Sequence, residues 1–166
     1  MARPERIEPG PGQESVWDYP RPPRVEPTTR RVRVVHAGAT VADTTRAVRV
    51  LETSQPPAFY LPLDDVDASL LVPSATHTFC EWKGTAAYVD VVVPGAEPVA
   101  DAGWTYPSPV PAFAELVDRY AFYAQKLDAC FVDDERVAAN EGSFYGGWIT
   151  SEVVGPFKGG AGSWGW

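Results

Sequence analysis

The residues that could do chemistry are concentrated in one short stretch, between His77 and Tyr88. Cys80 lies three residues after His77 and three residues before Lys83. On a tight turn this spacing places an imidazole and an ammonium near the sulfur, an arrangement that lowers a thiol pKa and produces a nucleophile. On an extended strand it places His77 and Cys80 on opposite faces. We therefore take His77, Cys80 and Lys83 as the candidate catalytic residues, with a small buried Cys80 as the alternative.

Lys83 is one of three lysines in a chain with eleven arginines, and it stands between Trp82 and Gly84. An ammonium that is partly enclosed in this way can hold an anion or pair with an acid. The alternative is an ordinary ion pair to Asp65 or Glu81. Because glycine permits a tight turn, Gly84 is expected to bring the side chains before it and the strand after it around one hollow.

Aromatic and titratable side chains on other short strands would complete a pocket at this place. The residues that we expect to bind a ligand are Tyr60, Asp65, Tyr88, Asp90, Trp104, Tyr106 and Tyr123. On the strand from Thr85 onward, Tyr88 and Asp90 share one face, which either meets water or lines a cavity. The other face carries Thr85, Ala87, Val89 and Val91 and is expected to face the core.

A metal or nucleotide site has little support. The acidic run 64–67 is not preceded by the Gly-Ser pair of a nucleotidyl-transferring site, and no P-loop or GxGxxG motif accompanies it. No CxxC or HxxxH spacing occurs among the two histidines and two cysteines, so we expect no metal and no cofactor. Cys80 and Cys130 are too few for a disulfide scaffold and are expected to remain thiols.

Charge and hydropathy exclude several classes of partner. The formal charge of −8 repels phosphate backbones and anionic membrane surfaces, and the basic residues between Arg24 and Arg33 fit a solvated flank. No apolar run approaches the roughly 20 residues of a membrane helix. Pro4 and Pro9 stand among charges at the N-terminus, which has no apolar segment of a secretion signal. We therefore expect neither a nucleic-acid nor a membrane partner, and a cytoplasmic location.

The length of 166 residues suits one domain, and the many prolines and glycines favour short elements joined by turns. We divide the chain into a disordered lead (1–14), an extended Trp/Pro arm (15–30), a single β-rich domain (31–160) and a tail (161–166). Trp17 and Tyr19 are poor residues to leave in water, so the arm is expected to dock on the domain. It could also close a pocket or reach a second subunit, which would make a homodimer.

Three copies of one pattern, an apolar strand, a turn and an outgoing strand, occur at 34–43, 92–101 and 131–138 and predict three hairpins. We expect the return strand of the first hairpin to continue through 46–51. The segment 57–62 ends in proline, and it is predicted to be a strand at a sheet edge or a bend.

A helix is predicted over 111–118, begun by Ser108 and Pro109. Residues 120–123 either continue it or form a strand, which we favour, and 63–71 contain at most a helical turn. The fold class is therefore mainly β (β-rich α+β): one compact antiparallel β domain built from three hairpins and one short helix.

Several segments together resemble a known family. They are 59–62 (FYLP) with Asp65-Val66, 78–88 (TFCEWKGTAAY), 102–107 (AGWTYP) and 121–123 (AFY). The chain thus resembles the bacterial and fungal domain of unknown function 427, sometimes labelled nucleotidyltransferase-like, from about Glu14 to Gly160. This family usually has proline where Glu81 stands here. The resemblance implies a compact, mainly antiparallel β fold similar to β-tent domains, with an exposed aromatic-lined cleft and no established activity.

Two functions fit these residues. The first is a small-molecule site, binding or enzymatic, for a ligand that the sequence does not name. The second is a non-catalytic interaction or self-association module, in which the Trp17 arm and the aromatic, glycine-rich tail provide the contact surface. Convergence of the His77, Cys80, Lys83 and aromatic side chains on one concavity would favour the first.

Overall fold

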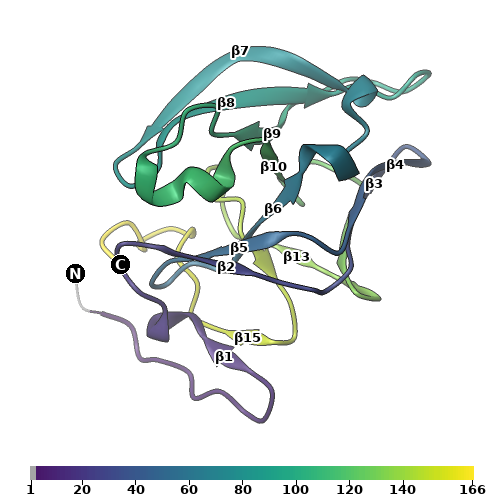
Figure 1. The fold of residues 1–166 in the computed structure, drawn as a ribbon. Coiled ribbons are helices and arrows are strands. Elements are labelled where there is room, and N and C mark those ends of the chain that lie inside the picture. The colour runs from purple at the N-terminus through teal and green to yellow at the C-terminus, as the bar shows by residue number, and fades with distance from the viewer. Residues whose placement is uncertain (1–2) are drawn as a thin grey trace.

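The computed structural model describes residues 3–166 and shows a mainly β, largely antiparallel architecture with almost no helix (Figure 1). The larger sheet has seven strands, in the order β2 (Arg24–Pro27), β5 (Val48–Leu51), β6 (Ala58–Pro62), β10 (Arg119–Phe122), β9 (Val99–Thr105), β8 (Gly84–Val91) and β7 (Leu71–Cys80). The second sheet has four, in the order β12 (Glu135–Arg136), β11 (Ala129–Val132), β3 (Val32–His36) and β4 (Ala39–Thr44).

Shorter elements complete the fold. Two strand pairs lie outside the main sheets: β1 (Glu14–Ser15) runs parallel to β15 (Val153–Val154), and β13 (Ala138–Ala139) is antiparallel to β14 (Trp148–Ile149). The helical segments that the structure describes are 3-10 turns: η1 (Val16–Asp18), η2 (Leu63–Asp65), η3 (Ala68–Leu70) and η4 (Pro111–Leu116). None of the helices in residues 3–166 has the length and apolar character needed to cross a membrane.

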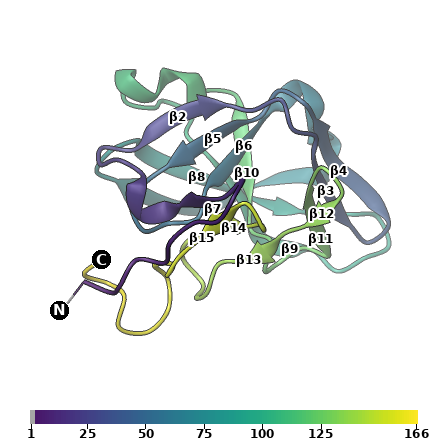
Figure 2. The same ribbon diagram turned by 90° about the horizontal axis from the view of Figure 1, so that it is seen from below.

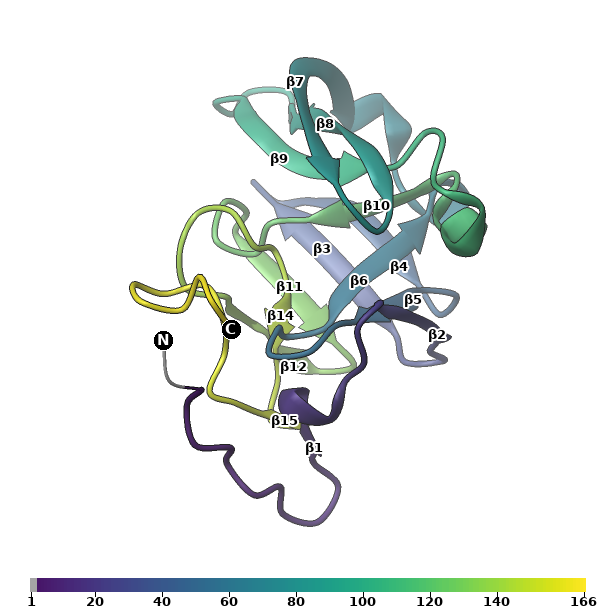
Figure 3. The same ribbon diagram turned by 90° about the vertical axis from the view of Figure 1, so that its left-hand side faces the viewer.

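The seven-stranded sheet has a hydrophobic core on each face, because side chains alternate along its strands. On β6, Phe59 and Leu61 pack into the core shared with the four-stranded sheet, whereas Tyr60 packs on the opposite side. Strand β10 divides its residues in the same way, with Phe122 in the shared core and Ala121 in the other. Figure 3 shows the four-stranded sheet lying behind β6 and β10. The second core consists mainly of aromatic rings.

Strand β8 serves both cores, which corrects the predicted assignment of its faces. Its first half buries Ala86 and Tyr88 in the aromatic core and leaves Thr85 exposed. In its second half Val91 is buried in the core shared with the four-stranded sheet, as predicted. The predicted alternation of side chains along β8 is therefore correct. The buried face changes, however, where the strand passes from the aromatic core to the core shared with the four-stranded sheet.

The three predicted hairpins are confirmed as the pairs β3–β4, β8–β9 and β11–β12. Residues 119–122 form a strand, as favoured, and 63–71 contain only the turns η2 and η3 before β7 begins. Both cysteines are free thiols.

Three local predictions are wrong. The return strand β4 ends at Thr44, and β5 belongs to the other sheet, because the chain crosses between sheets at 45–47. The edge alternative for 57–62 is wrong, because β6 lies between β5 and β10, but Pro62 does end the strand at a bend, where η2 begins. The segment 111–118 is not an α-helix but the 3-10 turn η4, which is kinked at Phe113 and follows the N-cap residue Val110.

The N-terminal arm docks on its own domain, as expected. Trp17 and Tyr19 are buried in a third cluster with Leu51 and Val153, and the Trp17 indole N–H donates to the Pro156 carbonyl oxygen at 2.9 Å. Residues before β1 have no regular secondary structure, yet the Ile7 N–H donates to the Gly155 carbonyl oxygen. The N- and C-terminal segments consequently lie side by side (Figure 2).

Candidate functional site

A cavity of about 260 Å³ lies against the aromatic core of the seven-stranded sheet. It is bounded by strands β5 and β6, the β7–β8 turn, the end of β9, and the segment 144–147 that crosses from the C-terminal part of the chain. We call it the aromatic cleft. Seven of the ten predicted site residues line it: Tyr60, Cys80, Lys83, Tyr88, Trp104, Tyr106 and Tyr123.

The β7–β8 turn places the thiol and the ammonium in the same cleft. Cys80 pairs with Gly84 across the ladder, so only three residues form the connection. Gly84 has φ = +107°, a conformation that glycine adopts far more readily than residues with a Cβ. The Lys83 carbonyl oxygen accepts a hydrogen bond from the Val110 N–H at 3.0 Å, which ties the turn to the segment before η4. The predicted role of Gly84 in gathering these side chains is therefore supported.

Lys83 is buried, with 9% of its surface exposed, and its Nζ lies 5.8 Å from the centre of the Tyr106 ring. None of the ion pairs found among residues 3–166 involves it. Burial by itself lowers the pKa of this ammonium, but Tyr60, Cys80 and Glu52 act in the opposite direction and the pKa is raised overall.

The phenols of the cleft are neutral hydrogen-bonding groups. Burial raises the pKa of Tyr60, Tyr106 and Tyr123. The Tyr123 hydroxyl donates to the Phe144 carbonyl oxygen at 2.9 Å, which fastens the crossing segment to β10 and the residues after it. Trp104 lies between two of these tyrosines, with ring centres 6.1 Å from Tyr60 and 4.6 Å from Tyr123. The floor of the cleft is thus a fixed set of rings.

The crossing segment approaches this floor closely because it contains glycine. A Cβ on Gly146 would lie 2.3 Å from the Trp104 ring, which no side chain could tolerate without a shift of the backbone. Tyr145 stands beside it with Lys158 Nζ 5.5 Å from its ring centre, and Lys158 donates to the Trp166 backbone oxygen at 3.3 Å.

Three predicted site residues, His77, Asp65 and Asp90, lie outside the cleft and do not converge with Cys80. His77 pairs with Ala87 on an extended strand, three residues from Cys80 and therefore on the opposite face; its Nδ1 is 3.1 Å from the Ala75 carbonyl oxygen. Asp65 forms an ion pair with Arg46 at 3.0 Å, and that pair lowers its pKa. The Asp90 carboxylate accepts the Asp101 N–H at 2.9 Å.

Several cleft residues were missed by sequence reasoning. They come from β5 and the residue after it, β7, the β7–β8 turn and the C-terminal segment: Val50, Glu52, Thr78, Trp82, Tyr145, Gly146 and Lys158. The aromatic residues spaced by glycines near 144–147 were a usable signal, because such a segment can pack only through its rings. Nothing local indicates which part of the domain those rings cover.

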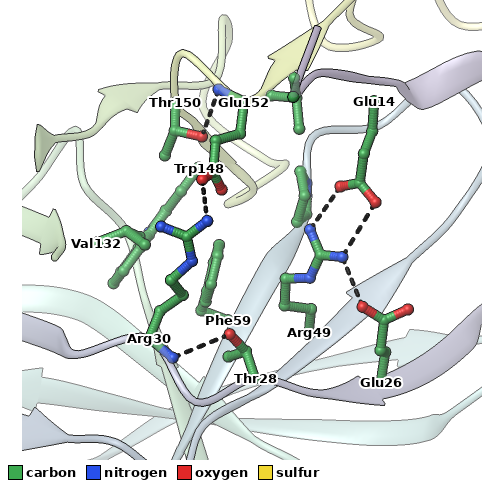
Figure 4. Close-up of a pocket in the computed structure, with 13 residues that line it drawn as sticks. Glu14, Glu26, Thr28, Arg30, Arg49, Phe59, Val132, Trp148, Thr150 and Glu152 are labelled. Carbon is green, nitrogen blue, oxygen red and sulfur yellow. Dashed lines mark hydrogen bonds and ion pairs between the residues drawn. The ribbon is translucent and has the colours of Figure 1, made fainter.

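A second cavity, of about 280 Å³, lies between the arm and the two sheets (Figure 4). Its charged groups are paired with one another: Arg49 binds Glu14 at 2.8 Å and Glu26 at 2.7 Å, while Arg30 pairs with Glu152. The Arg49 guanidinium lowers the pKa of Glu14. This network fastens β1 to β5 and leaves no charge available for a ligand, so we regard it as structural.

In the part of the chain that the structure describes, no three His, Cys, Asp or Glu side chains gather as metal ligands would. The fold and the cleft together define a small, mainly antiparallel β domain with a cavity walled by aromatic rings. The chain belongs to the family named Domain of unknown function (DUF427), whose model matches residues 24–133. That range includes every predicted residue of the cleft but not the crossing segment. No match was found among curated proteins.

Proposed function

We propose that this domain binds a small, ring-containing molecule in the aromatic cleft. The observation that carries the proposal is the convergence of buried phenol and indole rings, from β6, β8 and β9, on one open cavity. Ligand pockets are typically apolar and aromatic, with few polar groups at fixed positions. A cavity of about 260 Å³ is near the small end of that class, which favours a ligand of about one or two rings.

The rings of the cleft are positioned before a ligand arrives. Trp104 and Tyr123 are each held by a hydrogen bond, to Tyr60 and to the Phe144 carbonyl oxygen. Ordering these side chains on binding would therefore cost little conformational entropy. Preorganisation of this kind supports a binding site over a surface formed incidentally by packing.

The proposal is tested by titrating the protein with indole and with benzyl alcohol, followed by ligand-observed NMR. Tyr145 in the crossing segment and Tyr120 in β10 are both partly buried tyrosines, but only Tyr145 lines the cleft. Tyr145→Ala should weaken binding by about three- to tenfold, and the matched Tyr120→Ala should leave it unchanged in protein that remains folded. Equal loss in both variants, or no binding of either compound at millimolar concentration, would contradict the proposal.

A catalytic form of the same site would use the Cys80 thiol as nucleophile, since Cys80 and Lys83 line one cavity. An adjacent ammonium stabilises a thiolate. His77 would take no part, because it lies on the other face of β7.

Self-association is the second candidate function, and it is favoured by rings that remain exposed, two of which, Phe79 and Phe144, also line the cleft. Phe79, Phe144 and Trp164 are 77%, 52% and 65% exposed. The arm contributes less than expected to such a surface, because Trp17 and Tyr19 are buried against their own domain. Sedimentation velocity distinguishes the two cases: a concentration-dependent dimer that is lost when the three rings are replaced by serine would support this function, and a monomer throughout would end it.

A further inference from the structure

Lys83 is the only charged residue among 3–166 that is buried, and no acidic side chain pairs with it. Buried charges in proteins are usually paired, because an isolated charge loses its hydration. Glu52 also lines the cleft, but its carboxylate is paired with Arg21 at 3.4 Å. The ammonium therefore faces the cleft with no acidic side chain in ion-pair contact, although Glu52 is near enough to raise its pKa.

We infer that the ligand of the aromatic cleft is a small aromatic carboxylic acid, whose carboxylate pairs with Lys83 while its ring packs on the surrounding phenol and indole rings. The inference rests on the proposed function and adds the chemical class of the ligand. One buried ammonium matches one negative charge. Neutral tyrosine hydroxyls beside it can donate to the same carboxylate.

A phosphate is a poorer match to this cleft. Phosphate recognition commonly uses arginine forks or a set of backbone N–H donors, and no arginine lines the cleft. Glu52 and Glu81 line it instead and would repel a dianion. Lys158, the second lysine of the cleft, donates to the Trp166 backbone oxygen and is only partly buried. Lys83 is therefore the one buried ammonium of the cleft, and it matches a monoanion better than a dianion.

The two cysteines allow the inference to be tested without knowing the natural ligand. Cys80 lines the cleft beside Lys83, whereas Cys130 is 1% exposed and serves as an unreactive internal control. Iodoacetate and iodoacetamide both react with a thiolate in the same way: a carbon–sulfur bond forms and iodide leaves. Only iodoacetate carries a carboxylate. The ratio of the two alkylation rates therefore reports how strongly the Lys83 ammonium attracts an anion.

Alkylation of Cys80 is measured by peptide mass spectrometry in folded protein and in urea. We expect the iodoacetate-to-iodoacetamide ratio to be about five- to tenfold higher in the folded protein, as for one partly buried charge pair. Lys83→Met should remove this preference and Lys83→Arg should retain most of it. If Lys83→Met does not fold, the comparison of folded with unfolded wild-type protein still decides, since a ratio equal in both states overturns the inference.

Protection of Cys80 separates this inference from the proposed function. Benzoate should slow alkylation by iodoacetamide at concentrations where the isosteric, neutral benzamide has no effect. Equal protection by both would preserve the ring-binding cleft and overturn the carboxylate. Protection by inorganic phosphate, but not by benzoate, would overturn the aromatic carboxylate and indicate a phosphate ligand instead. If Cys80 is inert to both reagents in the folded protein, the cleft is closed and both proposals fail.

Discussion

The indole N–H of Trp104 donates to the hydroxyl of Tyr60 at 3.0 Å, and both side chains are buried. Their strands, β9 and β6, are not neighbours, because β10 runs between them. The hydrogen bond thus bridges across β10 on the cleft face of the sheet. It fixes two rings of the floor relative to each other, which a ladder of backbone hydrogen bonds alone would not do.

Removing the Tyr60 hydroxyl should leave the Trp104 N–H buried without an acceptor. An unsatisfied buried donor costs about 1–3 kcal/mol, so Tyr60→Phe should lower the free energy of unfolding by that amount. Tyr120→Phe is the matched control, since no hydrogen bond of its hydroxyl occurs among the described residues. Urea denaturation measures both, and equal midpoints for the two variants would show that the bond contributes nothing.

A side chain at Gly146 should push the crossing segment away from the cleft floor. In Gly146→Ala the new Cβ would meet the Trp104 ring at 2.3 Å, so the backbone must shift and binding of indole should weaken. Gly10→Ala, far from the cleft, is the control, because its Cβ would meet only the flexible end of Gln13. Unchanged affinity in Gly146→Ala would mean that this segment does not form a wall of the site.

Acid should loosen the attachment of β1 to β5 through the Arg49 network. The ion pair lowers the folded-state pKa of Glu14 below its ordinary value of 4.5. The stability that this pair provides is therefore fully present above pH 4.5 and is lost as the pH falls through the folded-state pKa. Because the Glu14 side chain is 43% exposed, we expect less than about 1 kcal/mol.

Glu14→Gln should accordingly be less stable than the wild type at pH 7, with the difference shrinking below pH 4.5. Urea midpoints measured between pH 7 and pH 3 test this, with Glu8→Gln as the exposed control, whose effect should be near zero throughout. A loss of stability in Glu14→Gln that does not change with pH would contradict the ion-pair explanation and indicate a packing effect.

The two thiols should differ sharply in reactivity. Burial raises the pKa of Cys130 to about 12, so at pH 8 it is a protonated, enclosed thiol. Titration with Ellman's reagent should detect one accessible thiol in the native protein and two in denaturant. Rapid reaction of both thiols in the native protein, or of neither, would be inconsistent with the positions of Cys80 and Cys130.

The parts of the fold that could be predicted are those determined by neighbouring residues. The three hairpins follow from turns flanked by apolar strands, and Gly84 indicated the turn that gathers Cys80, Lys83 and Tyr88. Crossings between sheets could not be predicted in this way. The separation of β5 from β4, and the position of Pro62 inside the larger sheet, depend on strands far apart in sequence.

The candidate site also contains residues whose positions could be predicted and residues whose positions could not. The aromatic residues were selected by type and converge as expected, whereas His77, Asp65 and Asp90 do not. The His77 side chain does not reach Cys80, because β7 is extended where a turn would be needed to bring the two together. Asp90 lies where β8 has passed from one core to the other, so its carboxylate meets a backbone N–H of β9.

The most direct test of the ring-binding cleft uses the indole N–H signals of ¹⁵N-labelled protein during titration with benzoate and with indole. Trp82 and Trp104 line the cleft, whereas the indoles of Trp17 and Trp148 donate to backbone oxygens elsewhere. We predict saturable shifts of the Trp82 and Trp104 signals, with the Trp17 and Trp148 signals unchanged. Signals that do not move with either compound, or that all move alike, would contradict a binding site in this cleft.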